Sequence, residues 1–190
     1  MHKDSWAIKA KKLGLRSRAA FKLEEILIKT KALKSNGLVL DIGSSPGGWS
    51  QLIKTLEPKS NVYAVDLLPM DPIKGVYFFQ EDIANIDTIY EISLLKTKFD
   101  LVISDLAPNL TGISAVDKEN IFELNSITLK TAVNYLNKSP GIFILKTFQN
   151  SLLKKIRLEM EKSFNIVQTY KPAASKSKSG EIYLYGERLL

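Results

Sequence analysis

The sequence predicts a single doubly wound α/β domain over residues 1–190, with helices on both faces of a seven-stranded, mostly parallel sheet. First, short apolar runs alternate with longer segments of helical periodicity, the pattern of repeated β–α–β units. Second, the first apolar run ends in a glycine-rich turn, as strands that lead into a ligand-binding loop often do. Third, 190 residues without an internal repeat fit one domain with its own core.

The first half of the chain predicts two helices and three strands. In chain order, these elements cover residues 17–30, 38–42, 49–56, 61–67 and 76–80. In the two helices, apolar residues recur at spacings of three and four, and Leu23, Ile26 and Leu27 face inward in the first. The strands are short runs rich in valine, leucine and aromatic residues, bounded by glycine, proline or charged residues.

The second half continues the alternation and ends in two consecutive strands. Its predicted elements, helix first and then alternating, cover residues 86–96, 101–104, 118–136, 141–147, 152–163 and 165–170, with a last strand at 181–185. No helical segment separates the last two strands, so we expect them to form a hairpin in which the last strand is antiparallel.

Composition excludes several function classes. The chain is 45% apolar and 25% charged, which is typical of a globular protein, and no apolar run approaches the ~20 residues of a membrane-spanning helix. It has no cysteine, so disulfides, thiolate metal sites and cysteine nucleophiles are excluded. The single histidine is His2, which we expect to be solvated, so a histidine triad or a metal site is not expected.

The charge favours a polyanionic partner. The net charge is +7, and solubility alone is the alternative explanation. The first 34 residues carry three acidic residues and ten basic ones, namely Lys3, Lys9, Lys11, Lys12, Arg16, Arg18, Lys22, Lys29, Lys31 and Lys34. A second cluster holds three lysines between Lys171 and Lys178. If the fold brings the two ends together, they form one basic surface for nucleic acid.

The turn after the first strand does not suit a dinucleotide. Its glycines, Gly43, Gly47 and Gly48, lack the G-x-G-x-x-G spacing, and Pro46 removes an N–H that a pyrophosphate would use. With the acidic Asp41 beside it, the loop favours a ligand without phosphates, such as the sulfonium S-adenosylmethionine, and NAD ranks well below. Trp49, directly after the glycines, is either a core anchor or a wall of the ligand pocket.

Acidic residues follow the first three strands of the predicted sheet. Asp66 comes 23 residues after Gly43, close to the spacing expected of a carboxylate that binds a ribose. Asp82, just past the third strand, could accept from an adenine amino group, and Asp41 ends the first. Each could alternatively be a solvated aspartate or a helix cap, but three behind a glycine loop favour a nucleoside site.

Five segments occur in a characteristic order along the chain: residues 16–23 (RSRAAFKL), 41–51 (DIGSSPGGWSQ), 66–70 (DLLPM), 104–109 (SDLAPN) and 146–148 (KTF). Through these segments the chain resembles the FtsJ/RrmJ family of ribosomal RNA ribose 2′-O-methyltransferases. The resemblance implies a Rossmann-like, S-adenosylmethionine-dependent methyltransferase fold. It also implies cofactor contacts from Gly47, Trp49, Asp66, Asp82 and Asp105.

The resemblance further implies a catalytic tetrad of Lys22, Asp105, Lys146 and Glu181. Asp105 and Lys146 follow or end strands at one edge of the sheet, and methyl transfer to a hydroxyl needs alignment and the removal of one proton, without a metal. Because a free lysine is protonated at neutral pH, we expect Lys146 to act as base only in the closed complex. The carboxylates would orient it, and Lys22 would position the phosphate and ribose.

Two departures from the family pattern and several alternatives bear on the target. Ser44-Ser45 replaces a pair of small apolar residues, and Gly180 stands where an arginine is expected before Glu181. Alternative functions are a tRNA or mRNA-cap ribose 2′-O-methyltransferase and a non-catalytic RNA-binding or ribosome-assembly factor. The segment 105–109 (DLAPN) replaces the Asp-Pro-Pro-Tyr-type motif of amino methylation, which disfavours DNA and small-molecule methyltransferases.

The expected partner is RNA, either large-subunit ribosomal RNA or an assembled ribosomal subunit. The basic segment at about 1–34 and the lysines of the loop near Lys176 would contact phosphates, with a strong dependence on salt. We expect a monomer with no membrane association. The expected location is the cytoplasm in a bacterium, or a mitochondrion, nucleus or other organelle in a eukaryote.

Overall fold

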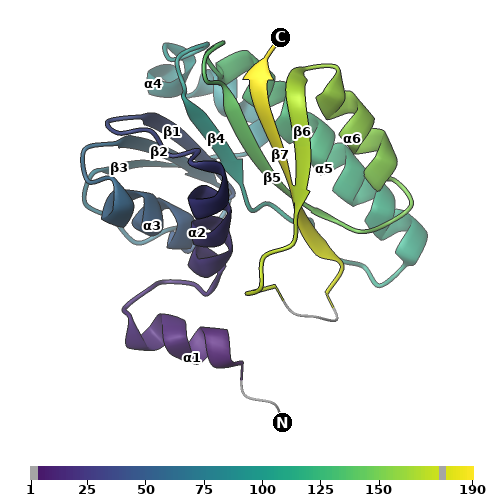
Figure 1. Ribbon diagram of the computed structural model, residues 1–190, viewed down its shortest axis with the longest axis horizontal. Helices are drawn as coiled ribbons and strands as arrows, with labels where there is room; N and C mark the ends of the chain where they lie inside the picture. Colours follow the sequence, from purple (N-terminus) through teal and green to yellow (C-terminus); the bar gives the residue numbers. More distant parts are fainter. Residues whose placement is uncertain (1–3, 176–178) are drawn as a thin grey trace.

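The computed structural model, which describes residues 4–175 and 179–190, has a mixed seven-stranded sheet in the order β3-β2-β1-β4-β5-β7-β6 (Figure 1). The strands are β1 (Leu38–Ile42), β2 (Asn61–Asp66), β3 (Val76–Gln80), β4 (Leu101–Ser104), β5 (Ile142–Phe148), β6 (Phe164–Tyr170) and β7 (Glu181–Leu189). The pairs from β3 to β5 are parallel. Their carboxyl ends therefore meet at one edge, where the candidate site lies.

The last strand runs against the others, as predicted. β7 lies between β5 and β6 and is antiparallel to both, with Lys146 opposite Tyr183 and Phe148 opposite Glu181. The reason is that β6 and β7 follow each other through a loop, which favours an antiparallel hairpin. Insertion of β7 next to β5 brings the start of β7 beside the end of β5.

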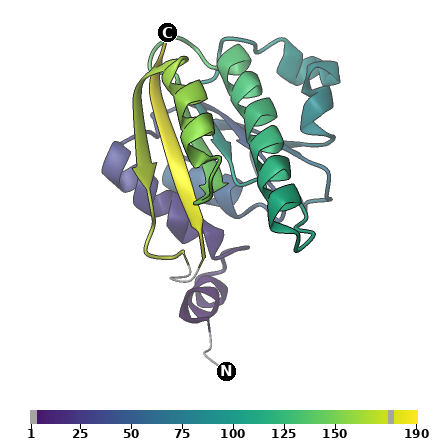
Figure 2. The same cartoon turned by 90° about the vertical axis from the view of Figure 1, so that its right-hand side faces the viewer.

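Helices cover both faces of the sheet (Figure 2). On one face, α2 (Ala19–Thr30) and α3 (Gly48–Leu56) bury Leu23, Ile26 and Ile53 completely. The other face is covered by η1 (Ile83–Thr88), α4 (Tyr90–Ser93), α5 (Ser114–Tyr135) and α6 (Leu153–Glu161). In the described part of the chain, no helix combines the length and the apolar character needed to cross a membrane.

Several elements differ from the sequence prediction, and β7 continues to Leu189, beyond the predicted end at residue 185. The segment expected as one helix at 86–96 is the 3-10 helix η1 followed by the single turn α4, and the helix expected from residue 118 begins at Ser114. The unpredicted helix α1 (Ser5–Lys12) is capped by Asp4, whose Oδ1 accepts from the N–H of Ala7 at 3.1 Å. It lies beyond the carboxyl edge of the parallel strands (Figure 1).

Candidate active site

The glycine-rich turn joins β1 to α3 and forms one wall of the site. Gly43 has φ +77°, and a Cβ there would lie 2.5 Å from Leu106 Cδ2. Gly47 has φ +101°, and at Gly48 a Cβ would lie 2.8 Å from Ser17 Cβ. The loop therefore needs glycine both for its backbone conformation and for the close approach of neighbouring segments.

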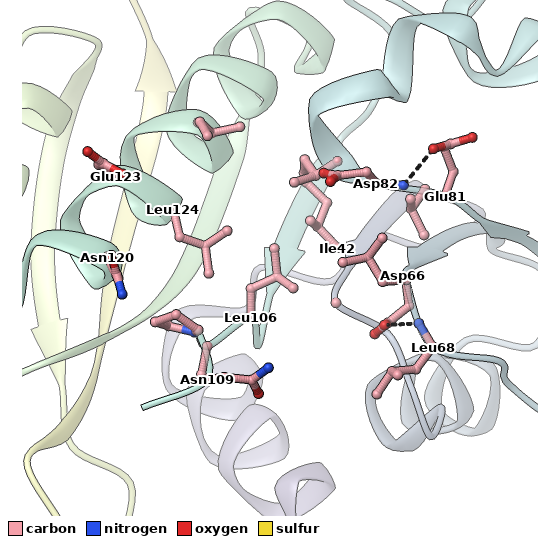
Figure 3. Close-up of a pocket in the computed structure, with 17 residues that line it drawn as sticks. Ile42, Asp66, Leu68, Glu81, Asp82, Leu106, Asn109, Asn120, Glu123 and Leu124 are labelled. Atoms are coloured by element: carbon pink, nitrogen blue, oxygen red, sulfur yellow. Dashed lines mark hydrogen bonds between the residues drawn. The ribbon is translucent and has the colours of Figure 1, made fainter. Parts of the chain in front are cut away.

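A cavity of about 510 Å³ opens beside this turn at the carboxyl ends of β1, β2 and β3. In Figure 3, Asp66 and Asp82 lie on one side of the cavity, and Asn120 and Glu123 of α5 lie on the other. Its volume falls within the ~300–1,000 Å³ of small-molecule sites. The lining residues are Ile42, Gly43, Val65, Asp66, Leu67, Leu68, Glu81, Asp82, Ile83, Leu106, Ala107, Pro108, Asn109, Asn120, Glu123, Leu124 and Ile127.

Asp66 connects the two loops that frame this cavity. Its Oδ2 accepts from the N–H of Ser45 and its Oδ1 from the N–H of Leu68, each at 2.8 Å. Ser45 Oγ also donates to the carbonyl of Pro69 at 3.0 Å. Each carboxylate oxygen has a second acceptor position, so the ribose prediction for Asp66 is compatible with these bonds.

Asp82 is a helix cap, and its position is also compatible with the predicted contact to an adenine amino group. Its Oδ1 caps η1 by accepting from the N–H of Ala84 at 2.9 Å, and its side chain also lines the cavity. The helical face of α5, with Asn120, Glu123 and Ile127, was not predicted as part of the site. Its spacing of three and four residues was the available signal, but the sequence does not say which helix covers the strand ends.

A smaller cavity of about 20 Å³ lies on the other side of the glycine turn. Gly43 lines both cavities, and Pro46, Gly48, Trp49 and Asp105 line only the smaller one. The position of Trp49 therefore supports its role as a core anchor, and a role as a wall of the ligand pocket stays a prediction, because Trp49 does not line the large cavity. Its side chain is buried and its Nε1 donates to the carbonyl of Ala19 at 2.9 Å, so it also anchors the start of α2.

Asp41 lies beneath the turn and lines neither cavity. It is fully buried, its Oδ2 accepts from Ser50 Oγ at 2.6 Å, and its Oδ1 has no hydrogen-bond partner among the described residues. Burial, reinforced by the charges of Asp105 and Asp66, raises the pKa of Asp41 to about 7, although Ser50 opposes this rise. The geometry gives Asp41 a place under the loop, and a cofactor contact from its side chain stays a prediction.

Replacement of Asp41 by asparagine is expected to remove a pH dependence of stability. The folded-state pKa of about 7 exceeds the ordinary value of 3.8, so the folded state binds the extra proton between these values and stability falls as the pH rises. Relative to Asp41→Asn, the wild type should lose about 2–3 kcal/mol of unfolding free energy between pH 5 and pH 8. Urea unfolding at the two pH values measures this, and parallel pH profiles would contradict it.

The four residues of the predicted tetrad are brought together on the α2 face of the sheet. Lys22 Nζ lies 2.6 Å from Glu181 Oε1, and Lys146 Nζ lies 3.2 Å from Asp105 Oδ1. Lys146 also donates to the backbone carbonyl of Asp105. The side chains of both lysines are largely buried, at 7% and 11% exposed, so these ion pairs are screened little by solvent.

Tyr183 joins the two ion pairs and was missed in the sequence. Its hydroxyl lies 3.0 Å from Glu181 Oε1 and 3.2 Å from Asp105 Oδ1. Its ring packs 5.8 Å from that of Trp49. The available signal was strand periodicity, because a residue two positions after Glu181 on a strand points to the same face. The network is therefore continuous from Lys22 through Tyr183 to Lys146.

Burial and neighbouring charges shift the pKa values of the three acidic groups in this network. Burial opposes ionisation of Glu181, but the hydrogen bond and charge of Lys22 outweigh it and lower the pKa of Glu181. Burial raises the pKa of Asp105, against the opposing charges of Lys146 and Lys22. Burial and the two carboxylates raise the pKa of Tyr183 far above its ordinary value, so its hydroxyl serves as a hydrogen-bond donor.

The two basic ends of the chain lie side by side. Ala174 is buried in a cluster with Ala10 and Phe21, and the N–H of Ala173 donates to Glu25 Oε2 at 2.7 Å. The segment after β6 therefore packs against α1 and α2. Lys3, Lys176 and Lys178, which were expected to contact phosphates, lie outside the described residues.

Sequence comparisons with known proteins all identify methyltransferases as similar to this chain. The model of the FtsJ-like methyltransferase family matches residues 15–189. The chain is 39% identical over 188 residues to a ribosomal RNA large subunit methyltransferase E from Thiobacillus denitrificans, covering 97% of this chain and 85% of that protein. It is 42% identical over 184 residues to the protein of the same name from Francisella tularensis, covering 95% and 89%.

Solved structures give the same result. The chain matches the crystal structure of a putative ribosomal RNA methyltransferase from Plasmodium falciparum with a TM-score of 0.81 and 32% identity, over 92% of this chain and 98% of that one. It also matches a chain of a fibrillarin/Nop5p complex with a TM-score of 0.63 at 17% identity, over 88% and 80%. The second likeness concerns the fold alone.

Proposed function

The chain belongs to the FtsJ-like methyltransferase family, and on this basis we propose that it transfers a methyl group from S-adenosylmethionine to a ribose 2′-hydroxyl of large-subunit ribosomal RNA. The observation that carries the proposal is the continuous network from Lys22 to Lys146. Asp105 belongs both to this network and to the wall of the small cavity, which shares Gly43 with the large one. An acid–base network and a nucleoside-sized cavity thus meet at one strand edge.

The large cavity fits the proposed methyl donor. Asp66 would hold the ribose hydroxyls and Asp82 would accept from the adenine amino group, while Leu106 and Leu124 supply apolar walls for the base. A side chain at Gly43 would collide with Leu106, and both residues line this cavity. When bound, the donor supplies a methyl group made electrophilic by the sulfonium.

The network supplies the groups that the acceptor hydroxyl needs. Lys146, fixed by the carboxylate and carbonyl of Asp105, would take the proton of the 2′-hydroxyl after losing its own on closure of the complex. Tyr183 holds Asp105, and Glu181 holds Lys22, each through a direct contact. Lys22, fixed in this way, would position the neighbouring phosphate. These residues align the two reactants, which is the main demand of an in-line displacement.

RNA is the acceptor that fits the surroundings of this network. Lys9, Lys11 and Lys12 of α1 lie on the segment that packs beside the β6–β7 loop, next to the network. These lysines would contact RNA phosphates, and phosphate contacts provide affinity with little sequence recognition. Residues 1–34 as an RNA-contacting part of one domain, a monomeric state and a cytoplasmic location stay predictions.

Methyl transfer from radiolabelled S-adenosylmethionine tests the proposal. The substrates are large ribosomal subunits that lack 2′-O-methylation, their free RNA, and tRNA. Label at a ribose of the large-subunit RNA is the expected result. Label on tRNA alone would contradict the target but retain the chemistry, and donor binding without transfer to any substrate would favour an assembly factor.

A further inference from the structure

Arg16 is the first arginine of the basic Arg16-Ser17-Arg18 segment, and the sequence groups it with phosphate-binding residues. In the structure its guanidinium instead donates hydrogen bonds to backbone carbonyls of the protein. Nη1 donates to the carbonyls of Pro46 at 3.1 Å and Asp71 at 2.6 Å, and Nη2 donates to the carbonyl of Pro72 at 2.8 Å. The planar guanidinium thus donates to three backbone carbonyls at once. The compact ammonium group of a lysine could not reproduce this geometry.

These carbonyls belong to the two loops that frame the large cavity. Pro46 is part of the glycine turn, and Asp71 and Pro72 are part of the β2–β3 loop, residues 67–75, whose Leu67 and Leu68 line the cavity. Arg16 therefore ties the two loops to each other and to the segment that leads into α2.

Packing at Gly47 shows how tightly this junction is built. A Cβ there would lie 3.1 Å from Arg16 Nη1, 3.0 Å from Met70 Sδ and 2.7 Å from Ile73 Cδ1. The backbone is fixed as well, because the N–H of Arg16 donates to Gln51 Oε1 of α3 at 2.9 Å. The junction between the loops thus has no room for a side chain at Gly47.

Arg18, two residues later, provides a contrast within the same segment. Its Nη1 pairs with Asp4 Oδ2 at 2.9 Å, at the start of α1. Both arginines are partly buried and carry the same charge, but their contacts differ: Arg16 contacts the loops of the large cavity, and Arg18 contacts the N-terminal segment.

We propose that Arg16 is a positioning residue for the methyl donor: its guanidinium holds the glycine turn and the 67–75 loop at the spacing that donor binding requires. The inference rests on the proposed function, since it assumes that the large cavity binds S-adenosylmethionine. Loss of the fork separates the loops on which Asp66 depends, so donor affinity falls, whereas the contribution of Arg16 to RNA phosphate binding is small.

The test compares Arg16→Lys and Arg16→Gln with the matched variant Arg18→Gln. Calorimetry with S-adenosylhomocysteine gives donor-site affinity, and binding of a large-subunit RNA fragment at several salt concentrations gives the number of phosphate contacts. Both Arg16 variants should raise the Kd for S-adenosylhomocysteine about tenfold or more, the loss of roughly one charged hydrogen bond. Arg18→Gln should leave that Kd within about twofold.

Two further readouts separate positioning from general destabilisation. Arg16→Lys should raise the KM for the donor while kcat at saturating donor stays within about threefold, and the salt slope of RNA binding should equal that of the wild type. An unchanged Kd for S-adenosylhomocysteine in Arg16→Lys, together with a reduced salt slope, would overturn the inference. If the wild type does not bind S-adenosylhomocysteine, the proposed function itself fails.

Discussion

Replacement of Lys146 by methionine is expected to reduce methyl transfer by about three orders of magnitude, the middle of the range for a lost general base. Methionine keeps most of the length of the buried side chain but removes the amine that lies 3.2 Å from Asp105 Oδ1. Lys146 lines neither cavity, so the affinity for S-adenosylhomocysteine should stay within about twofold of the wild type. Single-turnover transfer to undermethylated large subunits measures the chemical step.

The matched control is Lys138→Met, an exposed lysine shortly before β5. It loses the same charge and should retain full transfer. Because removal of Lys146 leaves Asp105 without its closest cation, thermal unfolding of both variants must be compared with the wild type. Transfer by Lys146→Met at more than about a tenth of the wild-type rate would contradict a role as base.

Replacement of Asp66 by alanine is expected to weaken donor binding by about 100-fold, or roughly 2.7 kcal/mol. Two effects add in this residue. The carboxylate accepts backbone N–H groups from Ser45 and Leu68, each at 2.8 Å, and hydrogen bonds to a charged group contribute about 1.5–3 kcal/mol each. The same carboxylate is also proposed to hold the donor's ribose. Calorimetry with S-adenosylhomocysteine measures the loss.

The control for this prediction is Asp71→Ala in the same loop. Its side chain is exposed and only its backbone carbonyl contacts Arg16, so donor affinity should change by less than about twofold. A comparison of S-adenosylhomocysteine with methionine, which lacks the ribose, localises the effect. Equal donor affinity in Asp66→Ala and the wild type would refute the placement of the nucleoside in the large cavity.

The sheet was predictable because strand signals are local. β1 and β4 begin and end at the predicted residues, since each is a short, largely apolar run bounded by glycine or aspartate. The segment 86–96 was wrong as one helix because Asp82 caps a 3-10 turn instead, and the chain restarts as α4 at Tyr90. Helix α1 was missed because its stability depends on the packing of Trp6 against Phe21, a contact that spacing does not show.

The candidate site residues near strand ends could be predicted from the sequence. The contacts between loops could not. Lys146, Glu181 and Asp105 follow or occupy strand ends, so one topology rule brings them together. The hydrogen-bond partners of Arg16 and the burial of Asp41 depend on which loops pack against the glycine turn. The sequence does not show which loops these are. Charge alone made Arg16 an RNA contact in the prediction, whereas its contacts in the structure are backbone carbonyls.

The junction at Arg16 has a thermodynamic consequence. The segment between α1 and α2 is attached to the glycine turn through Arg16 and to α3 through Gln51. Ordering of this segment therefore favours ordering of the glycine turn, and the reverse also holds. Any ligand that immobilises the basic N-terminal segment reduces the entropy that the donor must lose on binding. If RNA and the donor bind as proposed, the donor should in turn favour the ordered segment by the same factor, and the two ligands should share one coupling free energy.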